Sequence, residues 1–142
     1  MVKLAIEEEN NPKIELSDIE FKREEKSYTY ITICELRKIY NLNNRINFII
    51  GTDAFERIEQ WYEIDKLKKL VRFILFKRAV DANFDKFEYL KAKGFEFVAD
   101  ELPFEDISST HLRNMIKNNE NYDKLISVSV KEYIEENELY KN

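Results

Sequence analysis

Glycine, proline, cysteine and histidine are all scarce in this sequence. Its 142 residues include two glycines, two prolines, one cysteine and one histidine. A single cysteine cannot form an internal disulfide, and one histidine with no cysteine cluster cannot build a structural zinc site. No apolar run approaches the roughly 20 residues that cross a bilayer, and the first residues form no signal-peptide pattern. We therefore expect a cytoplasmic protein with no membrane partner.

An excess of positive charge is also lacking. The net charge is −5 and the isoelectric point is about 5.1. A broad electrostatic grip on DNA or RNA is therefore disfavoured, although a local basic pocket for a small phosphate ligand remains compatible with these totals. Hydrophobic residues make up 44% of the chain, which is typical of a folded protein. A chain of this length suits one domain, and we expect residues 1–142 to form it.

The hydrophobic periodicity predicts alternating helices and strands. A strand, a loop and a helix follow one another early in the chain, which indicates an α/β fold. The expected strands cover 13–18, 46–50, 71–76 and 95–98. The expected helices cover 2–9, 27–40, a segment after Asp53, then 65–70, 83–93, 107–117 and 129–137.

The turn Gly51–Asp53 lies directly after an expected buried strand. As pure structure it is an ordinary strand-to-helix turn, in which Asp53 caps the next helix in a box with Glu56. As chemistry it lies outside the carboxyl end of a strand, where open α/β sheets bind ligands and where glycine permits close approach of a ligand. The spacing alone favours neither interpretation.

The segment from Ile107 to Arg113 also has two interpretations. Ser108, Ser109 and Thr110 precede an amphipathic helix, and such residues are common helix N-caps. Hydroxyls and free backbone N–H groups at a helix start can also hold an anion, and an arginine one turn later can close over a phosphate. The capping interpretation is the simpler one for this motif in isolation.

Six segments, in this order, are similar to motifs of one known family. They are Ser27-Tyr28-Thr29 at a helix start, Gly51-Thr52-Asp53-Ala54 after a strand, Gln60-Trp61-Tyr62, a hydrophobic strand followed by Arg78, Ile107-Ser108-Ser109-Thr110 with Leu112-Arg113, and the terminal Val130-Lys131-Glu132-Tyr133-Ile134 with Leu139-Tyr140. With these motifs the chain resembles the bacterial nicotinate-nucleotide adenylyltransferases. The resemblance implies a Rossmann-like nucleotidyltransferase fold, in which helices flank a parallel sheet.

The resemblance also implies a reaction. Members transfer AMP from ATP to nicotinate mononucleotide, with magnesium, and release nicotinate adenine dinucleotide and pyrophosphate. By position, Thr29 and the backbone near Tyr62 would hold the nicotinate carboxylate, and Trp61 would stack on its ring. A flat π-face suits a flat cationic ring. The simpler alternative is that Trp61 only plugs a helix junction.

The same comparison assigns the nucleotide side. Gly51 and Asp53 would lie against the adenosine ribose or the bridging phosphates, and Arg78 would face the nucleotide. Ile107, Ser108, Ser109 and Arg113 would serve ATP, with Arg113 balancing phosphate charge. Arg78 is alternatively a solvated strand end.

One family motif has no counterpart in this sequence. The family's His-x-Gly-His, whose imidazoles bind ATP phosphates, needs two histidines, and the sole histidine here is His111. We therefore expect the C-terminal portion of a nucleotidyltransferase domain, without the first central strand and with little activity of its own. Exposed strand edges would then favour self-association or a partner chain. The alternative is a non-catalytic nucleotide-binding or interaction module derived from such an enzyme.

Overall fold

The computed structural model describes residues 1–76, 84–100 and 108–141. The chain divides into two compact units, and each is described by itself. Unit 1 comprises Met1–Asp18 and Ile107–Asn142, and unit 2 comprises Ile19–Asp106. The expectation of one domain over 1–142 stays a prediction, because the compactness of each unit does not test it.

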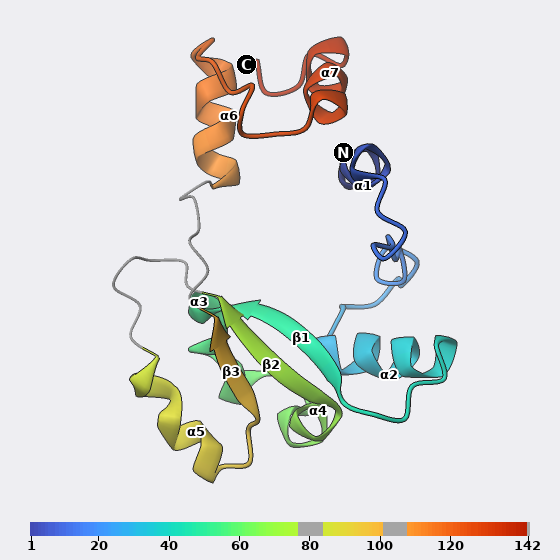
Figure 1. Cartoon of the computed structure of the whole chain (residues 1–142), viewed down its shortest axis with the longest axis vertical. Coiled ribbons are helices and arrows are strands. Elements are labelled where there is room, and N and C mark those ends of the chain that lie inside the picture. Colours follow the sequence, from blue (N-terminus) through green and yellow to red (C-terminus); the bar gives the residue numbers. More distant parts are fainter. Residues whose placement is uncertain (77–83, 101–107, 142) are drawn as a thin grey trace. The chain divides into compact units, whose positions relative to one another are not determined.

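Unit 2 is an α/β unit built around a parallel sheet of three strands (Figure 1). Its elements are α2 (Thr29–Ile39), β1 (Ile46–Gly51), α3 (Thr52–Phe55), the 3₁₀ helix η1 (Ile58–Gln60), α4 (Ile64–Leu70), β2 (Val71–Phe76), the 3₁₀ helix η2 (Asp85–Phe87), α5 (Glu88–Ala92) and β3 (Phe97–Asp100). The strand order is β1-β2-β3, and both pairs are parallel. The predicted α/β architecture is confirmed.

The core of unit 2 lies on one face of this sheet. The register aligns Phe48 with Phe73 and Phe73 with Phe97, so these side chains share a face. Phe55 of α3 is fully buried, and its ring lies 5.3 Å from that of Phe73 and 5.2 Å from that of Phe87. Large aromatic contacts therefore join α3 and η2 to the sheet. The core comprises Ile33, Ile50, Phe55, Ile58, Leu67, Val71, Phe73, Leu75, Phe87, Leu90, Phe95 and Phe97.

The opposite face of the sheet carries an apolar row. Ile49, Ile74 and Val98 are aligned across the three strands. Ile49 is 66% exposed and Val98 is 49% exposed. Parallel sheets are usually covered on both faces, so this row is unusual for a strand surface that faces solvent.

The expected strand over 13–18 is not formed. These residues are described as turn and irregular chain, and Ile14 and Leu16 are both exposed. An alternating pattern becomes a strand only when a neighbouring strand satisfies its backbone hydrogen bonds. No strand of the described residues pairs with this segment.

Several boundaries also differ from the sequence prediction. Asp53 is not the cap of α3, because Gly51 occupies the N-cap position and Asp53 lies inside the first turn. The expected strand at 95–98 begins at Phe97 instead. The helix expected from Asn83 begins as η2, which is a 3₁₀ helix, and continues as α5. Such errors are typical of element ends, where side-chain packing decides between turn types.

Unit 1 contains three helices among the described residues: α1 (Val2–Glu9), α6 (Ser109–Lys117) and α7 (Val128–Glu136). All three were expected within one or two residues. The carboxylate of Glu8 accepts hydrogen bonds from the backbone N–H groups of Val128, at 3.1 Å, and Ser129, at 2.7 Å. Glu8 therefore caps α7 from a distant part of the chain, where the helix dipole favours negative charge.

This cap gives unit 1 a defined pH dependence. Hydrogen bonds from Ser129 lower the pKa of Glu8 below its ordinary value of 4.5. A lowered pKa in the folded state adds stability above pH 4.5, and that stability is lost as the pH falls through the folded-state pKa. We expect Glu8→Gln to unfold at a lower temperature than the unsubstituted chain at pH 7, and the difference to shrink as the pH falls below 4.5. Thermal unfolding followed by circular dichroism measures both effects. Glu9→Gln, on the same helix, is the matched control, and an equal effect of both substitutions would contradict the capping role.

Candidate functional site

A pocket of about 280 Å³ lies in unit 2 where two segments distant in sequence meet. The first segment leads into α2, and the second leads from η1 into α4. The lining residues are Lys26, Ser27, Tyr28, Thr29, Gln60, Trp61 and Tyr62. This volume admits one substituted aromatic ring.

Aromatic side chains form the walls. The rings of Tyr28 and Tyr62 are stacked, with centroids 4.5 Å apart and planes 32° apart. Tyr30 lies further along, 6.4 Å from Tyr62. The rings of Trp61 and Phe48 of β1 are nearly perpendicular, with centroids 6.2 Å apart. Each wall is thereby tied either to α2 or to the sheet.

Two buried residues hold the segment that carries Trp61. Ile58 of η1 and Leu67 of α4 lie in the core on either side of it. Glu63 adopts the left-handed conformation, with φ of 51°, which turns the chain from the extended Trp61 into α4. The position of Trp61 is therefore determined by core packing on both sides.

The other side of the pocket is the start of α2. Tyr28 is the extended N-cap residue, and its own side chain makes no capping hydrogen bond. The Tyr28 carbonyl accepts hydrogen bonds from the N–H groups of Ile31 and Thr32, at 2.9 and 3.1 Å. The positive end of the helix dipole and the Thr29 hydroxyl thus lie at the pocket, an arrangement that favours an anion.

The pocket carries positive charge. Among the described residues that line it, Lys26 has the single formal charge, and none is Asp or Glu. The Lys26 Nζ atom lies 5.3 Å from the centre of the Tyr28 ring. The nearby Lys66 is paired with Glu63 at 3.0 Å, and the hydrogen bond that Lys66 donates to Glu63 raises the pKa of Lys66.

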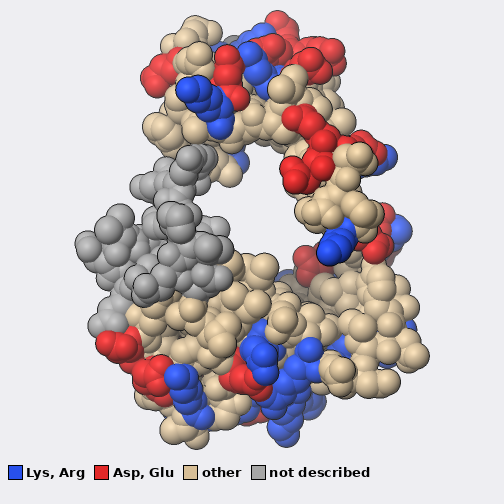
Figure 2. Space-filling model, in the orientation of Figure 1, with Lys and Arg blue, Asp and Glu red and all other residues tan. Residues whose placement is uncertain are grey.

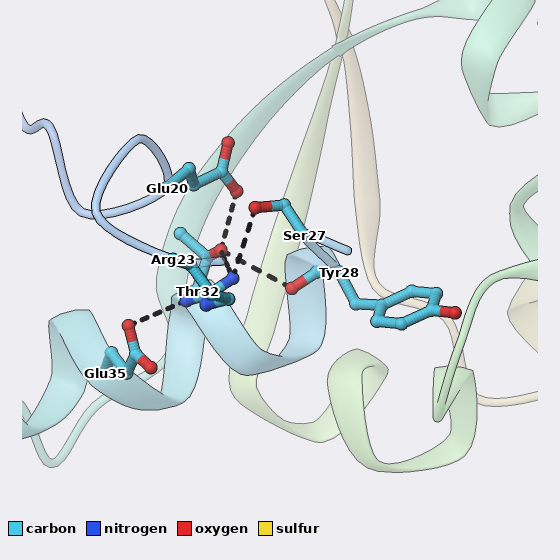
Figure 3. A network of polar contacts seen from close by, with 6 residues as sticks. All are labelled: Glu20, Arg23, Ser27, Tyr28, Thr32 and Glu35. Atoms are coloured by element: carbon cyan, nitrogen blue, oxygen red, sulfur yellow. Dashed lines mark hydrogen bonds and ion pairs between the residues drawn. The ribbon is translucent and has the colours of Figure 1, made fainter. Parts of the chain in front are cut away.

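A polar network fixes the loop before α2 (Figure 3). The guanidinium of Arg23 donates to Glu35 of α2 at 2.7 Å, and to Ser27 and Thr32 at 3.4 and 3.3 Å. The Thr32 hydroxyl donates to Glu20 at 2.6 Å. The Arg23 side chain is 13% exposed. We call this group the Arg23 network; it joins the segment from Glu20 to Ser27 to α2.

The predicted substrate residues fall into three groups. Thr29, Trp61 and Tyr62 line one pocket. Gly51 ends β1, and Asp53 lies on α3, beyond the carboxyl end of that strand. The third group is Arg78, which lies outside the described residues. Ile107, which is predicted for ATP, also lies outside them.

The predicted ATP residues lie on α6 in unit 1. The Ser108 hydroxyl accepts a hydrogen bond from the backbone N–H of His111 at 3.0 Å, so the capping interpretation is confirmed for this residue. Ser109 begins the helix and is exposed. The Arg113 guanidinium lies 5.7 Å from the centre of the Tyr140 ring. His111 itself is exposed.

Sequence reasoning did not select four residues of this region. Lys26, Tyr28 and Gln60 line the pocket, and Arg23 supports it. Lys26 and Arg23 lie in the charged segment before α2. No local spacing signals them, because their roles arise when the loop folds back on α2.

The described residues contain no group of three His, Cys, Asp or Glu side chains that could hold a metal ion. They also include no helix that is both long and apolar enough to cross a membrane. On the face shown in Figure 2, basic side chains lie beside acidic ones.

Comparison with known proteins identifies the family. Residues 1–115 match the family model described as cytidylyltransferase-like. A probable nicotinate-nucleotide adenylyltransferase of Staphylococcus epidermidis is 38% identical over 99% of this chain and 68% of its own. The nicotinate-nucleotide adenylyltransferase of Bacillus subtilis is 35% identical over all of this chain and 69% of its own. The chain belongs to the nicotinate-nucleotide adenylyltransferase family.

A further curated relative has the same family name, and a solved structure has the same fold. A probable nicotinate-nucleotide adenylyltransferase of Fusobacterium nucleatum is 40% identical over 89% of this chain. The chain spans 65% of that relative, about two thirds of the length of the curated relatives it matches. The solved nicotinic acid mononucleotide adenylyltransferase of Plasmodium falciparum superposes with a TM-score of 0.69 over 94% of this chain and 70% of that one. At 23% identity, this likeness shows the shared fold.

The Arg23 network should stabilise the loop that carries Lys26. We expect Arg23→Met to lower the free energy of unfolding by about 1.5 to 3 kcal/mol, the range for hydrogen bonds to charged groups. Trypsin should then cleave faster after Lys22 and Lys26, while cleavage after Lys13 serves as the internal control. The pair Arg23→Met with Glu35→Met should recover part of the loss, since no unpaired charge remains. Unchanged cleavage at Lys26 would contradict the role of the network.

Proposed function

We propose that this chain takes part in adenylyl transfer from ATP to nicotinate mononucleotide, which gives nicotinate adenine dinucleotide and pyrophosphate in NAD biosynthesis. The observation that carries the proposal is the aromatic, positively charged pocket of unit 2, found in a member of this family. The names of the relatives specify nicotinate nucleotide as the acceptor. We place the reaction in the cytoplasm.

The pocket has the features that a nicotinate ring requires. The face of Trp61 would stack on the flat cationic ring. The Thr29 hydroxyl and the backbone near Tyr62 would hold the carboxylate. Hydrogen bonds to a charged carboxylate are stronger than neutral ones and would orient the ring.

Other residues are proposed for the nucleotide. Gly51 and Asp53 would lie against the ribose or the bridging phosphates, and Arg78 would face the nucleotide. Ile107, Ser108, Ser109 and Arg113 would serve the phosphates of ATP. The guanidinium of Arg113 would balance phosphate charge.

Magnesium would enter with ATP in this proposal. The described residues form no cage for a metal ion. Magnesium commonly keeps several waters and is held by substrate phosphates with one or two carboxylates. We therefore assign no residue to the ion.

A second candidate is a non-catalytic nucleotide-binding or interaction module. The observation that favours it is the single histidine, His111, which lies on α6. In-line transfer depends on positioning and on charge stabilisation in the transition state. A chain without the paired histidines implied by the resemblance would bind the mononucleotide and turn it over slowly.

We also propose that β1 is a site of association. Among the described residues β1 pairs with β2 alone, and Ile49 of β1 is exposed in the apolar row that also crosses β2 and β3. An open edge beside exposed apolar residues favours pairing with another chain. We expect light scattering after size exclusion to give a mass above the 17.2 kDa of one chain. Ile49→Lys should lower that mass, with Tyr89→Lys at an exposed position of α5 as the control. A single-chain mass at every concentration would contradict association.

Nicotinate mononucleotide should bind at Trp61. Because Trp61 is the sole tryptophan, its fluorescence reports on this pocket directly. We expect a saturable change on titration, and a binding constant weakened by about fivefold to thirtyfold in Trp61→Leu, as for loss of a cation–π contact of about 1 to 2 kcal/mol. Calorimetry measures the variant, which has no tryptophan. Phe21→Leu is the control, because Phe21 is 93% exposed.

The two candidate functions separate when ATP and magnesium are added to the bound chain. Formation of nicotinate adenine dinucleotide with stoichiometric pyrophosphate would exclude the non-catalytic module. Binding without pyrophosphate release would favour that module for the chain on its own. A flat fluorescence titration at millimolar ligand would count against both.

A further inference from the structure

We propose that Lys26 determines the preference of the pocket for a pyridine mononucleotide with a carboxylate over one with a carboxamide. This inference rests on the proposed function, because it assigns a specificity residue to the same pocket. It adds the residue that distinguishes two ligands of nearly equal shape.

The first argument is the charge of the pocket. Lys26 supplies the single formal charge among the described lining residues, and the other lining side chains are neutral. The chain as a whole has a net charge of −5. A pocket lined by one cation and no carboxylate therefore has the opposite sign of charge to the chain as a whole. Such a pocket distinguishes ligands by charge where their shapes agree.

The second argument is the position of Lys26. Its Nζ atom lies 5.3 Å from the Tyr28 ring centre, and the Tyr28 and Tyr62 ring centres are 4.5 Å apart. The cation and the two rings therefore form one wall. Arg23 bonds to Ser27, the residue next to Lys26, so the loop is held where it carries Lys26 to the pocket.

The third argument is that no carboxylate of a described residue lines the pocket beside Lys26. In the described part of the chain, Glu63 pairs with Lys66, and Glu35 pairs with Arg23. Both of these carboxylates thus have their own cations. Glu24 and Glu25, which precede Lys26 in the chain, are exposed and are not among the lining residues of the pocket. Within the pocket, no described lining residue offsets the charge of Lys26.

The chemistry of the ligands completes the argument. Both mononucleotides carry a cationic pyridinium ring and the same phosphate. In the acid form a carboxylate offsets the ring charge, and it is attracted to Lys26. In the amide form the ring charge is not offset, and Lys26 repels it. Lys26 should therefore strengthen binding of the acid and weaken binding of the amide.

The ratio of the two affinities tests this inference. We expect Lys26→Met to lower the acid-to-amide affinity ratio by about twofold to fivefold, which lies within the range for a solvent-exposed charge pair. Lys26→Arg should retain most of the ratio, and Lys26→Gln should behave as Lys26→Met. Calorimetry and Trp61 fluorescence measure both ligands with the same chain. Lys69→Met, an exposed lysine of α4, is the matched control, and circular dichroism verifies that each variant is folded.

The outcomes are distinct. A fall in the ratio that Lys26→Arg does not share supports the inference. Equal weakening of both ligands would place Lys26 at the shared phosphate and overturn it, as would unchanged affinities. If the unsubstituted chain binds neither mononucleotide, the proposed function fails and the inference fails with it.

Discussion

The burial of Phe55 beneath the parallel sheet is the constraint on which unit 2 depends. Its ring contacts Phe73 of β2 and Phe97 of β3, and the chain continues from it into η1. Because α3 is only one turn long, it has little stability of its own and relies on this packing. The same packing brings Ile58 into the core and so determines where Trp61 emerges. The pocket is thus a consequence of aromatic packing three to six residues earlier in the chain.

Polar interactions hold the side of the pocket that the core does not reach. The core determines the Trp61 side of the pocket, whereas the Arg23 network determines the α2 side. The network is mostly shielded at Arg23 and more open at Glu35, so its bonds gain strength from partial burial without the full cost of desolvating both ions. A buried apolar anchor on one side and a polar one on the other give the pocket two supports of different kinds. The positive charge of the pocket comes from Lys26, on the loop that the Arg23 network holds.

The sequence predicted much of this arrangement, and its failures have physical causes. Strands 46–50 and 71–76 were correct because continuous apolar runs bounded by turns are strong signals of buried strands. The prediction of a strand at 13–18 was wrong. The residues alternate as expected, but among the described residues no partner strand satisfies their backbone hydrogen bonds. The cap at Asp53 was wrong because Gly51 takes the N-cap position, and the start of β3 was shifted to Phe97. Ser108 acts as a cap, as the simpler interpretation of its motif held.

The candidate site was also predicted only in part from the sequence. The motifs Ser27-Tyr28-Thr29 and Gln60-Trp61-Tyr62 could be recognised from the sequence, together with the family and the residues Thr29, Trp61 and Tyr62. Each motif consists of consecutive residues, so it can be recognised from the sequence alone. The structure decided that the two motifs share one pocket, that Tyr28 stacks on Tyr62, and that Arg23 holds the loop of Lys26. Those relations join residues more than 30 positions apart, or a loop to a helix, and they exist only after the core has closed.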